Sequence, residues 1–152
     1  MVLRAVICVL SLLGLADALY FTFAYYGRIK KARWVPEILC AREGSSCATV
    51  VETPYARVLG LPNSLLGIPY YIAVMLWLPW ATDVHGVEEY AYLFLFLTGA
   101  LLLASAVTVV LGFYLICALR RKLHVDCPLC YTAHAINVSL FVLLIWFCHA
   151  IL

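Results

Sequence analysis

Charged residues are scarce in this chain. Only 12% of its 152 residues are Asp, Glu, Lys or Arg, whereas 66% are hydrophobic and the mean hydropathy is +1.03. This composition lies far outside the range of soluble proteins, so it excludes a soluble catalytic domain and places nearly the whole chain in a lipid bilayer. No internal repeat, low-complexity tract or long linker is visible, and we expect one domain over residues 1–152. The net charge of only +2 gives no reason to expect a nucleic-acid partner.

Apolar runs that could cross a bilayer as helices occur four times. The predicted spans are residues 4–26, 65–80, 90–119 and 128–150. Arg4 ahead of an apolar run is also typical of a secretory signal peptide, but Asp17 and the bulky residues after it argue against a cleavage site. We therefore predict an all-α membrane protein, a four-transmembrane-helix bundle. Its first loop carries cysteines and continues into a short interfacial helix, from about Thr53-Pro54 to residue 60.

A Cys-x-x-Cys motif opens the last predicted span. Pro128 fits the first helical position, which puts Cys127 at the N-cap and Cys130 one turn deeper on the same face. The positive end of the helix favours the thiolate form that carries out disulfide exchange. The same face continues to His134 and Asn137, and polar groups inside a bilayer usually face a bundle interior or a site. The pattern predicts a redox motif at the mouth of a membrane helix.

The seven cysteines fall into two groups. Three stand alone within apolar runs and are expected to be small buried hydrophobic residues: Cys8, Cys117 and Cys148. Four spans bring the first and third loops to one membrane face, together with the other four: Cys40, Cys47, Cys127 and Cys130. These four could be redox-active, could hold zinc together with His124, or could form static structural disulfides. A Cys-x-x-Cys bridge closes only a tiny loop and so contributes little chain entropy, which favours the redox reading and predicts no metal site.

Three motifs together resemble the vitamin K epoxide reductase family. The run from Cys127 to Leu140, CPLCYTAHAINVSL, is similar to the fourth helix of that family. Asn63-Ser64-Leu65-Leu66-Gly67 is similar to its Asn-Ser-x-x-Gly entrance to the second helix. The spaced pair Cys40 and Cys47 resembles its loop cysteines. The resemblance covers nearly the whole chain, and the combination is specific where Cys-x-x-Cys alone is weak.

The resemblance implies an electron relay. Cys130 would be the thiol nearest a bound lipid quinone, of the ubiquinone or menaquinone type, and Cys127 would be its exchange partner. Cys47 would pass reducing equivalents to Cys127, and Cys40 would meet an external thioredoxin-like protein. Some prokaryotic relatives carry a fused thioredoxin-like domain. None is seen in this sequence, so the partner is expected to be a separate protein.

The resemblance also implies contacts to the quinone. Asn63 would donate a hydrogen bond to a quinone oxygen. The family often has a tyrosine four residues beyond the last cysteine of the motif, where this chain has His134. Histidine can still donate a hydrogen bond and can also move a proton. The replacement nevertheless argues against the epoxide substrate of the animal enzymes. Asn137 and Asp17 complete the predicted quinone-binding residues.

Asp17 is expected to reach the same depth in the membrane as the polar face of the last span. At about 1.5 Å rise per residue it lies roughly 14 Å below Tyr26, while His134 and Asn137 lie roughly 10 and 15 Å below Cys127. We therefore predict a hydrogen bond from Asp17 to His134 or Asn137, near the quinone. A plain helix–helix polar contact is the alternative interpretation.

The sequence thus predicts a membrane thiol–quinone oxidoreductase that makes protein disulfides. The alternatives are a reductase of a quinone or quinone epoxide at the expense of thiols, and a non-enzymatic membrane scaffold with structural or metal-binding cysteines. Nearly all Lys and Arg residues lie on the face of the working cysteines and only Arg4 on the other, which predicts a cytoplasmic active-site face in the cell membrane. The family resemblance points instead to an extracytoplasmic face.

Overall fold

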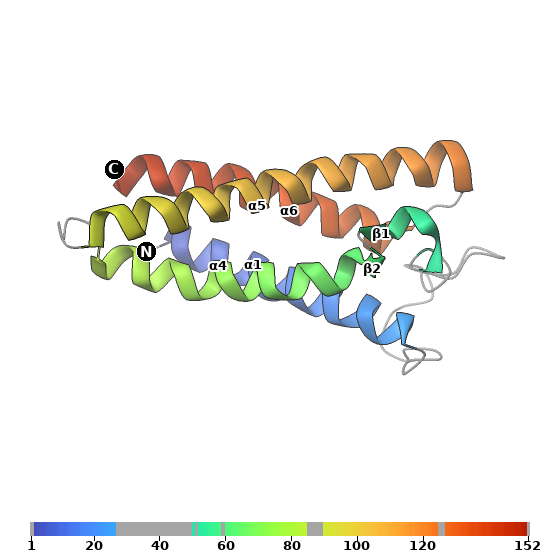
Figure 1. Ribbon diagram of the computed structural model, residues 1–152, viewed down its shortest axis with the longest axis horizontal. Helices are drawn as coiled ribbons and strands as arrows, with labels where there is room; N and C mark the ends of the chain where they lie inside the picture. Colours follow the sequence, from blue (N-terminus) through green and yellow to red (C-terminus); the bar gives the residue numbers. More distant parts are fainter. Residues whose placement is uncertain are drawn as a thin grey trace.

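The computed structural model describes residues 2–26, 50, 52–58, 60–84, 90–124 and 127–151. Four helices in this part of the chain are long and apolar enough to cross a membrane. They are α1 (Val2–Tyr25), α4 (Asn63–Val84), α5 (Ala91–Ala118) and α6 (Pro128–Ile151). They run side by side along the long axis of the molecule (Figure 1). The predicted all-α, four-span bundle is confirmed.

The helices differ from the predicted spans mainly at their ends. α4 begins at Asn63 and continues to Val84 instead of running from 65 to 80. Hydropathy predicts only the segment in contact with lipid. The helix extends beyond that segment where the flanking residues also form helical backbone hydrogen bonds. α5 passes into a π-helical turn, η3 (Leu119–Leu123), which ends at His124 in the left-handed conformation with φ 52°.

The short helix expected from Thr53-Pro54 does begin at Pro54, but it is a single turn and does not extend to residue 60. A single 3₁₀ turn, η1 (Pro54–Ala56), leads into strand β1 (Arg57–Val58), which pairs antiparallel with β2 (Leu61–Pro62). Gly60 in this hairpin has φ 82°, a conformation that favours glycine. With a chain reversal this close to Pro54, no further helical turn can form.

The hairpin is held against the end of the bundle. The Arg57 guanidinium donates a hydrogen bond of 3.2 Å to the Glu52 carbonyl and lies 5.4 Å from the centre of the Tyr25 ring on α1. Such a cation–π contact stabilises by roughly 0.5–1 kcal/mol at an exposed site. Ala56, directly before the hairpin, is buried in one cluster with Cys127 and Cys130, so this segment covers the end of the bundle next to the cysteine motif.

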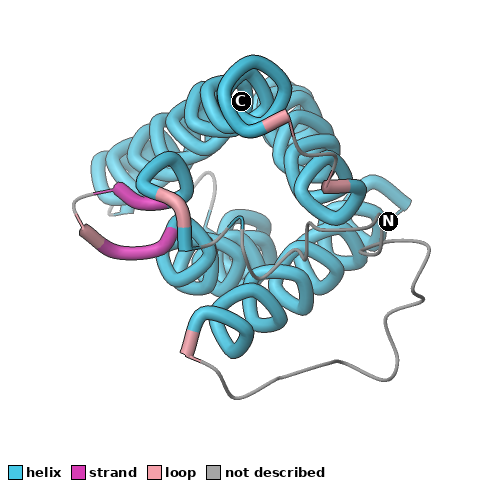
Figure 2. Tube along the Cα trace, turned by 90° about the vertical axis from the view of Figure 1, so that its right-hand side faces the viewer, coloured by secondary structure: helices cyan, strands magenta, loops and turns pink. Residues whose placement is uncertain are grey.

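Packing pairs the helices around a common axis. α1 packs against both α4 and α6, and α5 packs mainly against α6, whereas α4 and α5 make the smallest contact of the four neighbouring pairs. An end-on view shows the four helices arranged around one centre (Figure 2). The core on the side of the described termini includes Val74, Leu140 and Leu144. A second cluster, with Phe21, Leu115, Leu119, Cys127 and Cys130, fills the opposite end.

The three lone cysteines are free thiols, as expected, but they are not equally buried. Cys148 is buried, Cys8 is partly buried and Cys117 is exposed. The prediction of a buried residue is therefore wrong for Cys117. α5 is apolar all round, so its hydropathy could not show which face packs against neighbours and which meets lipid.

Candidate active site

Cys127 and Cys130 form a disulfide at the start of α6. Their Cα atoms are 5.3 Å apart, and the Cys130 backbone N–H donates a hydrogen bond of 3.3 Å to the Cys127 sulfur. This N-cap geometry follows from Pro128 at the first helical position, as the sequence predicted. The two side chains are only 1% and 5% exposed, so the pair is sealed from bulk water inside the bundle end.

A cavity of about 510 Å³ begins at Cys130 and extends between the four helices. This is the size of a typical small-molecule site. Its walls are mostly apolar, and they include outward-facing residues of the loosely packed pair α4 and α5: Leu66, Leu103 and Val107. The cavity therefore connects the disulfide with the lipid-facing surface of the bundle.

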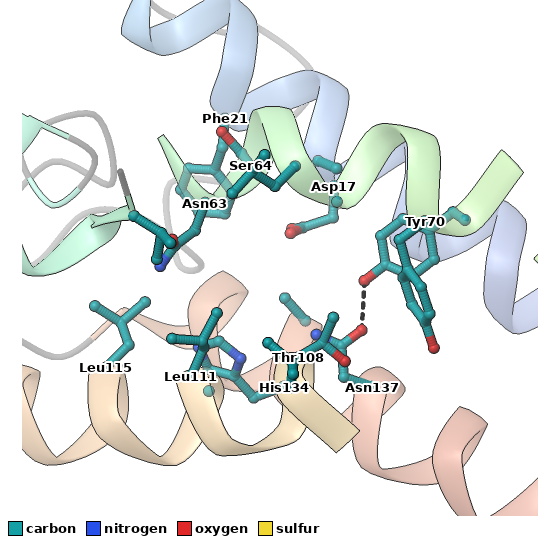
Figure 3. Close-up of a pocket in the computed structure, with 18 of the residues that line it drawn as sticks. Asp17, Phe21, Asn63, Ser64, Tyr70, Thr108, Leu111, Leu115, His134 and Asn137 are labelled. Atoms are coloured by element: carbon teal, nitrogen blue, oxygen red, sulfur yellow. Dashed lines mark hydrogen bonds between the residues drawn. The ribbon is translucent and has the colours of Figure 1, made fainter. Parts of the chain in front are cut away.

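His134 lies one turn beyond Cys130 and lines the cavity (Figure 3). Within the described part of the chain, its two buried ring nitrogens have no hydrogen-bond partner. The ring rests against the backbone of α5 at Gly112, where an added Cβ would lie only 2.6 Å from His134 Nδ1. The two ring nitrogens of His134 thus lie beside the disulfide and can hydrogen-bond to a ligand.

Asn137 lies one turn deeper on the same face of α6, which confirms the predicted cavity-facing row. The Tyr71 hydroxyl of α4 donates a hydrogen bond of 2.7 Å to Asn137 Oδ1, drawn dashed in Figure 3. Because the oxygen is engaged, the amide NH₂ is the group left to donate. Beside Tyr71, the Tyr70 hydroxyl lies 2.9 Å from Ser105 Oγ on α5.

Tyr70 and Tyr71 were missed by the sequence reasoning. Their rings lie 5.1 Å apart and form the inner end of the cavity, with hydroxyls bound to α5 and α6 respectively. A signal was present in the sequence: the two residues lie seven and eight positions after Asn63, which puts them on the same helix face. Tyrosine hydroxyl groups on that face of a membrane span indicate that both residues belong to the site.

Asn63 stands where α4 begins and lines the cavity, as predicted. Its buried Oδ1 has no hydrogen-bond partner among the described residues. The neighbouring Ser64 accepts a hydrogen bond of 3.1 Å from Thr22 of α1, which ties the start of α4 to the first helix. Close approach of Gly67 and Ala18 continues this contact.

Asp17 also lines the cavity, and its carboxyl group points into it (Figure 3). The predicted hydrogen bond to His134 or Asn137 is wrong. His134 has no partner in the described part of the chain, and Asn137 is bound by Tyr71 instead. Tyr71 reaches across from α4 and donates its hydroxyl proton to Asn137 Oδ1. Asp17, His134 and Asn137 do line one cavity, as their similar depths in the membrane predicted. Similar depth does not determine which of the side chains form a hydrogen bond.

Two of the predicted site residues are not among those that the structure describes. Cys40 and Cys47 lie outside the described residues, so the relay through the first loop stays a prediction. Among the described residues, no group of three His, Cys, Asp or Glu side chains could hold a metal ion. The described termini lie at the end of the bundle opposite the start of α6 (Figure 1).

Comparison with known proteins decides the family. The family model for the vitamin K epoxide reductase family matches residues 5–145. This chain belongs to the vitamin K epoxide reductase family. No curated protein gives a significant match. Membership implies a multi-pass membrane protein with thiol–quinone oxidoreductase activity.

The cavity of this family member suits a quinone. A quinone is a flat apolar ring with two carbonyl oxygens, and it needs apolar walls with a few hydrogen-bond donors. The cavity offers mostly apolar walls, the His134 nitrogens, which have no partner among the described residues, and the amide groups of Asn63 and Asn137. Cys130 borders the same space, so a redox-active sulfur and the donors converge on one ligand-sized volume.

Proposed function

We propose that this chain oxidises the thiols of a thioredoxin-like partner and so supplies disulfides to other proteins, with a lipid quinone as electron acceptor. The observation that supports this most is the Cys127–Cys130 disulfide at the head of α6, with Cys130 on the cavity wall. A bound quinone supplies the chemistry of a two-electron, two-proton acceptor.

The cysteines carry electrons toward the cavity by thiol–disulfide exchange. The Cys47 thiolate attacks the Cys127 sulfur, which breaks the Cys127–Cys130 bond and releases Cys130 as a thiolate. Cys40 then attacks Cys47, forms the loop disulfide and frees Cys127. The positive end of α6 stabilises negative charge on these two sulfurs. Partner thiols reduce the loop disulfide and acquire a disulfide of their own.

The polar groups on the cavity wall hold the quinone. Asn63 and His134 donate hydrogen bonds to quinone oxygens, and Asn137 presents its NH₂ because Tyr71 holds its oxygen. Two-electron reduction places negative charge on those oxygens, so donors already in place stabilise the reduced form more than the oxidised form.

His134 favours the disulfide-forming direction. It stands where the family often has tyrosine, the residue associated with the epoxide substrate of animal enzymes. An imidazole whose two nitrogens have no partner in the described part of the chain can both donate a hydrogen bond and move a proton, as quinone reduction requires. We therefore propose ubiquinone or menaquinone as the acceptor.

We further propose that the cysteine end of the bundle faces the cytoplasm. Arg57, Arg120, Arg121 and Lys122 lie at this end, whereas Arg4 lies at the other. Short segments rich in Lys and Arg are retained on the cytoplasmic side. A cytoplasmic site suits an organism that oxidises its intracellular proteins.

The proposed direction is tested with purified protein in lipid nanodiscs. A reduced thioredoxin-like donor and a short-chain ubiquinone analogue should give quinol and oxidised donor in equal amounts. Cys127→Ser and Cys130→Ser should each abolish the reaction. Turnover of a quinone epoxide but not of a quinone would show that the electron acceptor is an epoxide and would overturn the proposed quinone. Activity of the double Ser variant equal to wild type would show that the cysteines are only a scaffold.

A further inference from the structure

We propose that Asp17 is a catalytic proton donor, which protonates a quinone oxygen from the α1 side of the cavity, across from Cys130. This inference rests on the proposed function and adds to it a residue with no part in the cysteine relay. It begins from an unexplained acidic side chain inside the membrane. A carboxyl group within a span is costly unless it has a partner or a task.

Among the described residues, Asp17 has no structural partner. No hydrogen bond or ion pair joins it to any of them, and the described residues of the cavity wall include no Lys or Arg. Its carboxyl group instead points into the cavity (Figure 3). The alternative, a polar contact that holds two helices together, requires a partner on another helix. Thr22 has such a partner in Ser64, and Tyr71 has one in Asn137.

The backbone around Asp17 brings α1 unusually close to the site. Tyr71 packs against Gly14, one turn before Asp17, and Gly67 packs against Ala18, the next residue. Gly14 is needed because a Cβ at this position would collide with the Tyr71 ring, whereas a Cβ at Gly67 would make only ordinary contacts at 3.5 Å with Ala18 and Tyr71. The close α1–α4 contact therefore carries Asp17 to the cavity wall.

The reaction needs protons on both sides of the cavity. Oxidation of the Cys127 and Cys130 thiols to a disulfide releases two electrons and two protons, and reduction of a quinone to a quinol takes up the same number. Cys130 and His134 lie together on α6, so they supply a proton to one of the two quinone oxygens. The neutral carboxylic acid of Asp17 gives its proton to the other oxygen. The carboxylate then regains one of the protons that the thiols release.

Other titratable groups around the cavity must be separated from Asp17 in any pH experiment. They come from three helices: Tyr20 of α1, Tyr70 and Tyr71 of α4, and Cys130 and His134 of α6. The part of α5 that lines the cavity contributes no titratable side chain. The other groups except His134 are phenols or thiols. Asp17 and His134 can each be replaced by a neutral amide of similar shape, which allows their effects to be separated.

The first test uses Asp17→Asn in the nanodisc assay with the ubiquinone analogue. General acid catalysis contributes about 100-fold or more, so kcat should fall by about that factor while KM stays near wild type. Asp17 can donate a proton only while it is protonated, so the fall in rate on the alkaline side of the pH–rate profile should disappear in Asp17→Asn and persist in His134→Gln. Ser11→Ala is the matched control, because Ser11 is a buried polar residue of α1 outside the cavity wall and without a hydrogen-bond partner among the described residues.

The second test needs no turnover. Infrared difference spectra of the oxidised protein, with and without the ubiquinone analogue, should show a perturbed carboxylic-acid C=O band in wild type and Ser11→Ala. Asp17→Asn should lack this band. An unchanged kcat and pH profile in Asp17→Asn, or a persistent band, would overturn the role of Asp17. Failure of the wild type to reduce the quinone would instead refute the proposed function, and the infrared result would still stand on its own.

Discussion

Gly112→Ala should inactivate the enzyme through His134. The added Cβ would lie 2.6 Å from Nδ1, 3.0 Å from Cγ and 3.3 Å from Cε1 of the imidazole. Ordinary contacts of such atoms lie at about 3.5–4.0 Å, so the ring must move by about 1 Å. Misplacement of a catalytic group by 1 Å can cost about 100-fold in rate. We therefore expect kcat/KM for the quinone to fall by roughly that factor.

Gly99→Ala on the same helix is the matched control. A Cβ at Gly99 would have no neighbour within 4 Å. Both substitutions gain about 1 kcal/mol of helix propensity, so only the contact with His134 distinguishes them. Quinone reduction by each variant in nanodiscs, with thermal unfolding measured in parallel, provides the comparison.

A double-mutant cycle completes the argument. Once His134→Ala has removed the ring, the extra methyl group has nothing to displace, so Gly112→Ala should cost nothing further. If the double variant is instead about 100-fold less active than His134→Ala, the two losses are independent. That result would refute the proposed link between the two residues. Full activity of Gly112→Ala alone would show that the position of the ring does not matter.

Three further predictions concern the relay, the inner end of the cavity and the orientation. Cys130→Ala should accumulate a Cys47–Cys127 mixed disulfide on non-reducing peptide mapping, because the competing sulfur is gone; its absence would mean that the relay order is wrong. Tyr71→Phe should lower the free energy of unfolding by only ~0.6 kcal/mol, the average for an interhelical hydrogen bond in a bilayer. It should raise KM for the quinone because the Asn137 amide can then rotate, and an unchanged KM would exclude Asn137 from binding. In intact cells, a membrane-impermeant thiol reagent should fail to label Cys47 after reduction; efficient labelling from outside would reverse the proposed orientation.

The sequence contained enough to predict those features of the site that depend on one helix at a time. Pro128 and the 3.6-residue period were sufficient to place Cys130, His134 and Asn137 on one face of α6, and hydropathy was sufficient for the four spans. These features follow from local geometry, so no knowledge of neighbouring helices was required.

Features that depend on two helices could not be predicted in the same way. The hydrogen bond that Asn137 receives comes from Tyr71, 66 residues earlier in the chain, and Asp17 lines the cavity without a bond to Asn137. The role of Gly112 emerges only when α5 is seen against His134. An apolar helix such as α5 gives no sequence signal for the face that it turns inward.

The central claim is that the Cys127–Cys130 pair exchanges two electrons with a quinone in the adjacent cavity. A single-turnover experiment tests it most directly. The Cys40→Ser/Cys47→Ser variant, in which the first loop cannot re-reduce the Cys127–Cys130 disulfide, is fully reduced in nanodiscs and mixed with one equivalent of a ubiquinone analogue under anaerobic conditions. Quinol absorbance and free thiols are followed together. The account predicts one quinol per protein, formed at the same rate as the loss of the Cys127 and Cys130 thiols, and none in Cys130→Ser. Quinol formation while both thiols remain free, or retention of full activity by Cys130→Ser, would contradict it.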